Sequence, residues 1–502
     1  MPAQRGPKDI DESTDTYDTI DWLVKHVVPN NGQVGIWGIS YPGFYAAMSL
    51  IDAHPALKAA SPQAPVADWF RGDDWRHNGA LFLAHTFNFM TFFGRPWREP
   101  GQMPAHGRFD MGTPDAYDFF LRLGPLSEYP TELFGTQAGF WNQLMEHDRF
   151  DAFWKARDYR PHLKNVRPAV MTVGGWFDAE DQLGPLTVYE TIERQNPQAN
   201  NILVMGPWAH GQWMQDDGEQ LGNLRFAAKT GEFFRDHIML PFFAHHLKGK
   251  KDPELPEAFV FETGRNQWRK HARWPPAEAA QRTIYLSEGG RLRFEPQSQS
   301  GYDEYVSDPN KPVPFTDEIA RGMTYNYMTS DQRFAARRTD VLTYETEPLE
   351  TDLAIAGPIE CDLVVSTTGT DADWVVKLVD AYPGDYPNAN PNPTRVQMGG
   401  YQQLVRGEPF RGRFRNSFEK PEPFEPGQTT NVRFEMPDVY HTFRRGHRLI
   451  VHVQSSWFPL VDRNPQKFVS IGKATRADFQ SAVQRVYRGG PRGSQVRVRV
   501  LQ

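Results

Sequence analysis

The sequence lacks three features that would narrow its class at once: paired cysteines, a long hydrophobic run and an excess of basic residues. Its 502 residues contain one cysteine, Cys361, which excludes an internal disulfide and a cysteine-rich metal site. No stretch approaches the roughly 18 apolar residues that a membrane span requires. The formal net charge of −7 provides no basic surface for nucleic acid. We therefore expect a soluble protein without nucleic-acid or membrane partners.

The N-terminal residues also lack a feature, the apolar core of a secretory signal. The chain as printed is therefore expected in the cytoplasm, whereas a signal peptide on an upstream segment would make the protein periplasmic or secreted. The length exceeds one ordinary hydrophobic core and predicts two or three domains. A homo-oligomer is left open by the sequence.

Helices alternate with buried strands through the first half of the chain. Residues 15–28 have the spacing of an amphipathic helix, with an apolar face made of Tyr17, Ile20, Leu23, Val24 and Val27. A strand is predicted at 33–38 and a helix at 42–55. The same alternation continues with a strand at 167–177, a helix at 186–195, a strand at 201–208 and a helix at 231–248. This order predicts a parallel α/β sheet.

Two other regions have different patterns. Residues 66–155 are rich in Phe, Trp and Met without strand alternation, which predicts a helical cap. After a linker at 249–258, residues 259–502 alternate with period two between Pro- and Gly-rich turns, which is typical of an all-β jelly roll. The α/β core is accordingly assigned to residues 1–65 and 156–250.

Ser40 stands between the first predicted strand and its helix, in the order strand, sharp turn, helix. Gly38 and Gly43 frame it, but Pro42 occupies the position where the G-x-S-x-G nucleophile elbow has its second glycine. The frame is therefore an incomplete match to that motif.

Two further residues complete the order of a catalytic triad. In α/β-hydrolases the serine, the acid and the histidine follow one another along the chain, each after a strand. Ser40, Asp178 and His210 occupy these positions. A serine hydroxyl needs a base to take its proton, and a third group must orient that base. We predict an α/β-hydrolase, the alternative being that these are ordinary turn and loop residues.

Three motifs resemble one family of such enzymes. GISYPG (38–43), GGWFDAED (174–181) and GPWAH (206–210) are similar to the serine, acid and histidine motifs of the family that contains cocaine esterase, X-Pro dipeptidyl-peptidase, α-amino-acid ester hydrolase and glutaryl cephalosporin acylase. The resemblance extends over essentially the whole chain, including residues 260–276. It implies acyl transfer through an acyl-serine, with the backbone N–H of Tyr41 as one oxyanion donor, and no metal or organic cofactor.

The resemblance to the α-amino-acid ester hydrolases includes a carboxylate cluster that holds the ammonium group of the substrate. Asp74 in GDDW, Glu180 and Asp181 match its three positions. The alternative is that Glu180 and Asp181 cap the helix beginning near Gly184, and that GDDW is a solvated loop.

The resemblance thus implies a small-molecule substrate, an ester or amide of an α-amino acid, including β-lactam acyl compounds. An X-Pro dipeptidyl-peptidase, which also binds an N-terminal ammonium group, is one alternative. A glutaryl-type acylase or esterase is another, although three carboxylates would repel its acyl tail. Part of the aromatic cap could line an acyl pocket rather than the core, among Trp69, Phe70, Trp75, Phe87 and Phe89.

The position of Ser40 near the start of the chain raises a further expectation. A complete α/β-hydrolase sheet needs on the order of a hundred residues before the serine strand, and here there is room for one helix. We expect an N-terminally truncated sheet that lacks the family's second oxyanion donor, a tyrosine. The RGP segment at residues 5–7 resembles the family and favours a misplaced start. A truncated, non-catalytic paralogue is the alternative, and weak or no activity is expected from the chain alone.

Overall fold

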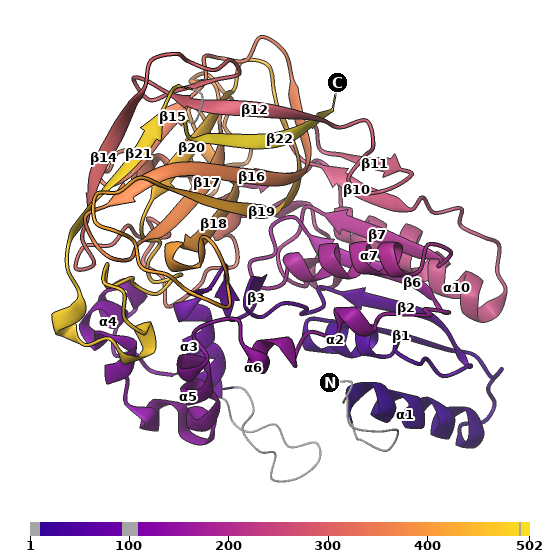
Figure 1. Cartoon of the computed structure of the whole chain (residues 1–502). Helices are drawn as coiled ribbons and strands as arrows, with labels where there is room; N and C mark the ends of the chain where they lie inside the picture. The colour runs from indigo at the N-terminus through magenta and orange to yellow at the C-terminus, as the bar shows by residue number, and fades with distance from the viewer. Residues whose placement is uncertain (1–10, 93–108, 491–492, 502) are drawn as a thin grey trace.

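The computed structural model describes residues 11–92, 109–490 and 493–501. Figure 1 shows an α/β sheet with its helices at the lower right, a helical region at the lower left and a β-domain above both. The RGP segment and part of the predicted cap, residues 93–108, lie outside the described residues. None of the described helices has the length and apolar character needed to cross a membrane.

The α/β sheet contains six described strands, of which the first five are parallel and the last is antiparallel. Their order across the sheet is β1 (Val34–Ile39), β2 (Leu57–Gln63), β6 (Ala169–Gly175), β7 (Asn201–Gly206), β10 (Ala258–Glu262) and β11 (Gln267–His271). This confirms an α/β-hydrolase-like sheet. Strand β2 was not predicted, because its sequence LKAASPQ is poor in the β-branched and aromatic residues that favour strands.

Helices cover both faces of this sheet. The helices α2 (Tyr41–Met48) and α7 (Leu183–Gln195) pack on one face around Val170 of β6. On the other face, Met171 of β6 contacts the continuous helical segment 230–248. Successive side chains of β6 therefore enter opposite cores, as the pleat of a strand requires.

The predicted first helix is α1 (Glu12–His26), and its N-terminus is capped by the Asp11 side chain. The predicted apolar face is mostly not buried: Ile20 is 3% exposed, whereas Val27 is 46% exposed. The neighbouring strand β1 is at the edge of the described sheet, and Trp37 on it is also 46% exposed. This edge consequently presents an apolar surface.

The cap combines helices with a small sheet that the sequence does not signal. Its described helices are α3 (Leu83–Phe92), α4 (Ala116–Leu123), α5 (Ala138–Glu146) and α6 (Ala152–Lys155), together with short 3₁₀ turns. Three two-residue strands lie between residues 72 and 81. Such short strands carry no readable periodicity, so only a helical cap is predicted for this region from the sequence. Phe70 and Phe87 are fully buried in a core that the cap shares with the β-domain.

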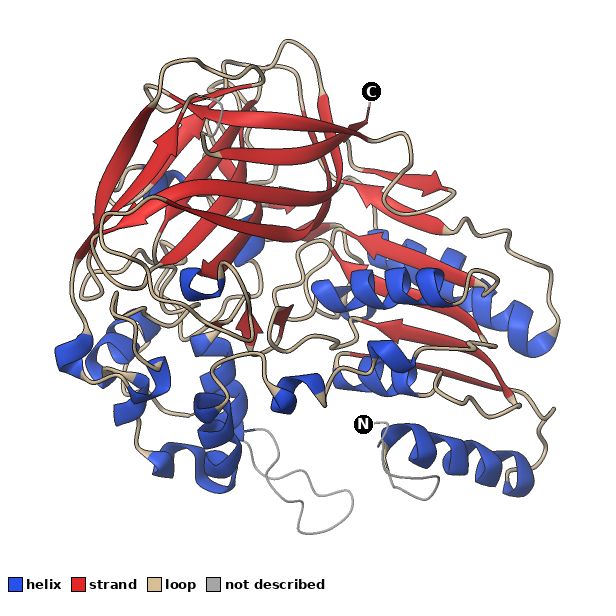
Figure 2. Ribbon diagram, viewed as in Figure 1, coloured by secondary structure: helices blue, strands red, loops and turns tan. Residues whose placement is uncertain are grey.

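The β-domain consists of eleven described strands, from β12 (Ala280–Ser287) to β22 (Gln495–Leu501), and Figure 2 shows them as a sandwich with few helices. This confirms the predicted all-β C-terminal domain. The predicted start at residue 259 differs from the strand pairing, however. Strand β10 pairs in parallel with β7, so the hydrolase sheet extends through β11 to His271. Strand pairing across the predicted linker is a tertiary property that local periodicity does not contain.

A lysine lies inside the β-domain on strand β17 (Asp373–Ala381). The Lys377 side chain is fully buried, donates one hydrogen bond to Gln332 Oε1 at 3.0 Å and lies 4.8 Å from the centre of the Trp457 ring. Burial lowers the pKa of Lys377 to about 7. Because the unfolded chain holds this proton up to about pH 10, the free energy of unfolding rises with pH between about 7 and 10.

Lys377→Met is therefore expected to stabilise the protein at pH 7 by about 1–3 kcal/mol. At this pH the burial of the amine costs on the order of 4 kcal/mol of folding free energy. This cost exceeds the free energy that the hydrogen bond to Gln332 contributes, so removal of the amine stabilises the protein. At pH 10 most of the gain should disappear, because the amine is then neutral in the folded protein and close to its ordinary pKa in the unfolded chain, so little free energy is spent on releasing the proton. Urea denaturation at the two pH values measures this, and a variant that is less stable at both would contradict the prediction.

Candidate active site

Ser40 occupies a strained turn between β1 and α2. Its φ of 65° and ψ of −127° lie in a region that ordinary residues rarely adopt. A Cβ on Gly38 would lie 2.5 Å from Pro42 Cβ, and one on Gly43 would lie 2.2 Å from Gln63 O on β2. Gly43, three residues after Ser40, thus permits the close approach of the turn to β2 that a nucleophile elbow needs. This explains why Pro42 can occupy the position of the motif's second glycine.

Asp178 and His210 meet at the carboxyl ends of β6 and β7. His210 Nδ1 lies 2.9 Å from Asp178 Oδ2, and the backbone N–H groups of Glu180 and Asp181 donate to Asp178 Oδ1 at 2.9 and 3.0 Å. Burial would raise the pKa of Asp178, but His210 and these N–H groups lower it below its usual value. The carboxylate is therefore charged and can hold the Nδ1 proton of the imidazole.

The histidine loop also approaches the serine turn. Gly211 has a φ of 71°, and a Cβ on it would lie 3.7 Å from Ile39 Cγ2, next to Ser40. The other ring nitrogen, His210 Nε2, lies 3.6 Å from Glu180 Oε2. Within the described residues no hydrogen bond joins Ser40 to His210. The structure thus brings the three predicted triad residues to one sheet edge and orients the histidine by its aspartate.

Asp74 and Glu180 are joined through the backbone, because the N–H of Asp74 donates to Glu180 O at 3.0 Å. Asp74 has a φ of 50°. Its carboxylate accepts a hydrogen bond from Trp69 Nε1 at 3.3 Å and lies 3.3 Å from His85 Nε2. Cap and sheet therefore meet at this pair of acids, and the role of the carboxylate cluster stays a prediction.

Asp181 is the most deeply buried acid of the cluster. Both of its carboxylate oxygens are buried without a hydrogen-bond partner. Burial, followed by the charges of Asp74 and Asp73, raises the pKa of Asp181 well above its ordinary value. Asp73 is different, because its carboxylate accepts N–H groups including that of Gly184, although burial still raises its pKa to about 8. A positive charge placed beside Asp181 would be strongly favoured.

His85 is a site residue that sequence reasoning missed. Its nitrogen and the carboxylate oxygens of Asp74 and Glu180 lie within 4.8 Å of one another, a grouping that could hold a cation. Burial would lower the pKa of His85, but the hydrogen bond with Asp74 and the charge of Glu180 raise it. No sequence spacing singles out this histidine, because it reaches the acids only when α3 packs within the cap beside the turn that carries Asp74.

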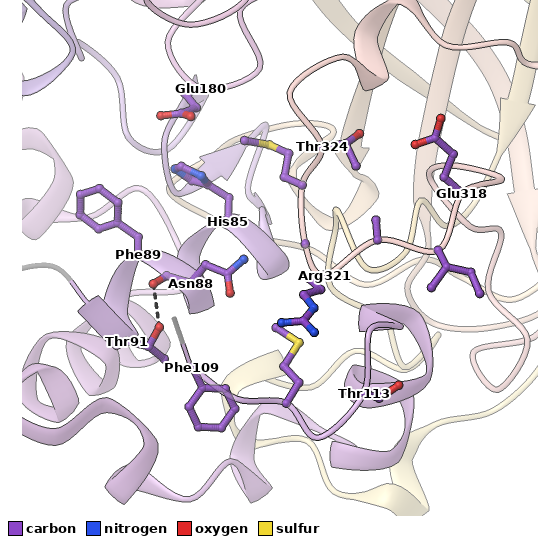
Figure 3. A pocket seen from close by; sticks show the side chains of 15 residues that line it. His85, Asn88, Phe89, Thr91, Phe109, Thr113, Glu180, Glu318, Arg321 and Thr324 are labelled. Carbon is purple, nitrogen blue, oxygen red and sulfur yellow. Dashed lines mark hydrogen bonds between the residues drawn. The ribbon is translucent and has the colours of Figure 1, made fainter. Parts of the chain in front are cut away.

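Two cavities meet at this cluster. The first, of about 320 Å³, contains Ser40, Tyr41 and Asp74, and its walls are mainly aromatic: Trp69, Trp75, Phe89, Phe140 and Trp154. The second, of about 630 Å³, begins at His85 and Glu180 and runs between the cap and the loop 318–324 of the β-domain (Figure 3). Of the aromatic cap residues considered above, three therefore line a cavity and two are core.

Comparison with known proteins shows to which family this chain belongs. The family model for X-Pro dipeptidyl-peptidase (S15 family) matches residues 4–212, and that for the X-Pro dipeptidyl-peptidase C-terminal non-catalytic domain matches 253–497. A crystal structure of an aminopeptidase from a marine sediment Thaumarchaeota archaeon is 38% identical, with a TM-score of 0.92, over 100% of this chain and 82% of that chain. The chain belongs to the X-Pro dipeptidyl-peptidase (S15) family.

Two further relatives of this S15-family chain are informative. An α-amino acid ester hydrolase structure is also 38% identical, with a TM-score of 0.91 and the same shares of each chain. The cocaine esterase of Rhodococcus sp. (strain MB1 Bresler) is 26% identical over 98% of this chain and 85% of its own length. The S15-family chain is accordingly a serine hydrolase of the esterase and peptidase kind.

Tyr41 begins helix α2, so its backbone N–H belongs to the positive end of the helix dipole, directly after Ser40. This position is suitable for an oxyanion donor, and that role stays a prediction. The cavity that contains Ser40 also includes Arg157, whose guanidinium lies 3.5 Å from the centre of the Phe153 ring and donates to Phe153 O at 2.7 Å.

Glu180→Gln is expected to change the pH dependence of turnover. Burial would lower the pKa of His210, but Asp178 and Glu180 raise it to about 10. Since the general base must be neutral, removing the Glu180 charge should move the acid limb of kcat/KM to lower pH. Charges less than 4 Å apart interact by about 1–4 kcal/mol, which corresponds to a shift of about one pH unit or more.

A des-amino ester is the appropriate substrate for this pH profile, because its own charge does not change with pH. Glu318→Gln is the matched control, since Glu318 lines the far end of the larger cavity. An acid limb at the same pH in Glu180→Gln and the natural protein would show that Glu180 does not control the histidine.

Proposed function

We propose that this chain hydrolyses esters or amides of α-amino acids through an acyl-enzyme on Ser40. The observation that carries the proposal is the buried carboxylate of Asp181, which has no hydrogen-bond partner and lies 4.0 Å from His210 Nδ1, beside Asp74 and Glu180 and next to the cavity that contains Ser40. A substrate ammonium group supplies a further positive charge beside these three carboxylates, in addition to His85 and His210. The aromatic wall of the same cavity is suited to an apolar or aromatic acyl side chain.

In the proposed mechanism, Ser40 Oγ attacks the acyl carbonyl and its proton passes to His210 Nε2. Asp178 holds the Nδ1–H and stabilises the imidazolium, while the Tyr41 N–H donates to the oxyanion. Collapse of the tetrahedral intermediate breaks the bond to the leaving group, which takes the proton from His210. Water then attacks the acyl-serine by the reverse sequence and releases the acid; an amine in place of water would give acyl transfer.

The ammonium group also affects the base. Glu180 and Asp74 are among the charges that raise the pKa of His210. A cation bound between them offsets these charges, so the pKa of His210 falls when an amino substrate is bound. Substrate binding and activation of the histidine are then coupled through the same carboxylates.

The alternatives differ in what they require of the acyl group. An X-Pro dipeptidyl-peptidase would use the same ammonium site with a longer acyl part. A glutaryl-type acylase would need a cation in the acyl cavity, and Arg157 is such a cation. Burial lowers the pKa of Arg157, and its hydrogen bond to Phe153 O already uses one donor. The carboxylate cluster favours the amino substrate over the glutaryl one.

Asp74→Asn tests the proposal with two esters, phenylglycine methyl ester and its des-amino analogue, methyl phenylacetate. We expect kcat/KM for the amino ester to fall by about 10- to 100-fold, the usual effect of losing a hydrogen bond between charged groups. The des-amino ester should change by less than about threefold.

The matched control is Asp118→Asn, a half-exposed aspartate on α4 of the cap that pairs with Arg122. It should leave both esters unaffected. An equal loss on both esters in Asp74→Asn would mean that the cluster supports the fold rather than the ammonium group, and the proposed substrate class would be wrong.

A further inference from the structure

The larger cavity has a charge at its far end that the proposed reaction does not use. Arg321 lines this cavity on the loop 318–324, and its guanidinium makes no ion pair or hydrogen bond within the described part of the chain. Figure 3 shows Arg321 between Asn88 of α3 and Thr113, with Glu180 at the opposite end of the cavity. Glu318 lines the cavity as well, but it lies along the loop and points away from Arg321.

The loop that carries Arg321 is anchored to the cap on both sides of it. Ala320 O accepts the N–H of Ala116 at the start of α4, at 2.8 Å. Gly322 packs so closely against α3 that a Cβ on it would lie 2.3 Å from Asn88 Nδ2. The backbone of Arg321 is thus fixed over the cavity, although its side chain is exposed. A held, unpaired guanidinium is a ready partner for a carboxylate.

The position of the cavity indicates which part of the substrate it receives. The smaller cavity contains Ser40 and takes the acyl side chain. The leaving group must lie beside His210 Nε2, because this atom protonates it. Glu180, whose carboxylate is 3.6 Å from that atom, lines the larger cavity. The larger cavity, about 630 Å³ in volume, is therefore on the leaving-group side and is large enough for an amino acid.

From this arrangement we infer that Arg321 binds a carboxylate on the leaving group, so that the enzyme selects zwitterionic substrates with an ammonium group on the acyl part and a carboxylate beyond the scissile bond. The inference rests on the proposed function for the direction in which the substrate lies. The carboxylate can belong to the second residue of a dipeptide or to a β-lactam nucleus, and both present the same chemistry to Arg321.

Arg321→Met is the test, with phenylglycyl-alanine, its C-terminal amide and phenylglycine methyl ester as substrates. We expect KM for the dipeptide to rise about tenfold, as is usual for a partly exposed charge-assisted hydrogen bond. The amide and the methyl ester should change by less than about twofold. Arg321→Lys should retain part of the preference. Arg337→Met, an exposed arginine of the β-domain outside both cavities, is the matched control.

Binding to Ser40→Ala protein, measured by calorimetry, separates this inference from the proposed function. If that protein binds the dipeptide more tightly than its amide, and Arg321→Met removes the difference, the carboxylate site stands even where the natural protein does not turn over the methyl ester. Equal effects of Arg321→Met on dipeptide and amide, or no effect on either, would overturn the inference. Ampicillin and its methyl ester, tested in the same way, show whether a β-lactam nucleus is accepted as the carboxylate source.

Discussion

Ser40→Ala is expected to lower kcat for phenylglycine methyl ester by about 10⁴-fold or more, as loss of the nucleophile does in other serine hydrolases. The acyl-enzyme cannot form without the hydroxyl. A water molecule that attacks the ester directly is not held in the position of the Ser40 hydroxyl. The substitution should not disturb the fold, because the turn is held by backbone contacts: the N–H of Ser40 donates to Gln63 O at 3.0 Å, and alanine keeps that donor.

Turnover by purified natural protein and by the variant should be measured side by side, with thermal melting as the check on folding. Ser298→Ala, an exposed serine in a β-domain loop, is the matched control and should retain full activity. Activity that survives in Ser40→Ala would show that hydrolysis does not pass through this residue. A fall in activity with an unchanged melting temperature is the expected result.

Asp178→Asn is expected to lower kcat by about 10⁴-fold, the loss seen when a triad aspartate becomes an amide. The ionised carboxylate can only accept hydrogen bonds, so it keeps the proton of His210 on Nδ1. This leaves Nε2 free to act as base. An amide can turn its NH₂ toward Nδ1, which would place the proton on Nε2 and remove the base. The imidazolium that forms during the reaction would also lose its counter-charge.

Asp380→Asn is a matched control for the burial of this aspartate. Asp380 is also a buried carboxylate that pairs with histidines, His447 at 2.8 Å and His441 at 3.1 Å, but it lies in the β-domain. Both variants should lose stability, because each exchanges a buried charge for an amide beside histidine, and only Asp178→Asn should lose kcat. Similar losses of kcat in the two variants would attribute the effect to general destabilisation.

Much of the fold and of the predicted site was readable because it depends on local pattern. The alternation of buried strands and helices predicts a parallel sheet, and period two in the last half predicts an all-β domain. Ser40, Asp178 and His210 each follow a predicted strand, and parallel strands place their carboxyl ends at one edge. The apolar face of α1 shows the limit of this reasoning, since the pattern is present but only Ile20 is buried.

The sequence by itself determined which residues could form a nucleophile, a base and its orienting acid, because these follow from strand ends and chain order. Only the tertiary structure decided what surrounds them. His85 reaches Asp74 from the next helix of the cap, Asp181 lacks a hydrogen-bond partner, and Arg321 arrives on a loop of another domain. These features depend on how separate segments pack against one another, from neighbouring cap elements to loops of different domains. Their energies come from burial and charge in three dimensions, which no spacing of residues along the chain records.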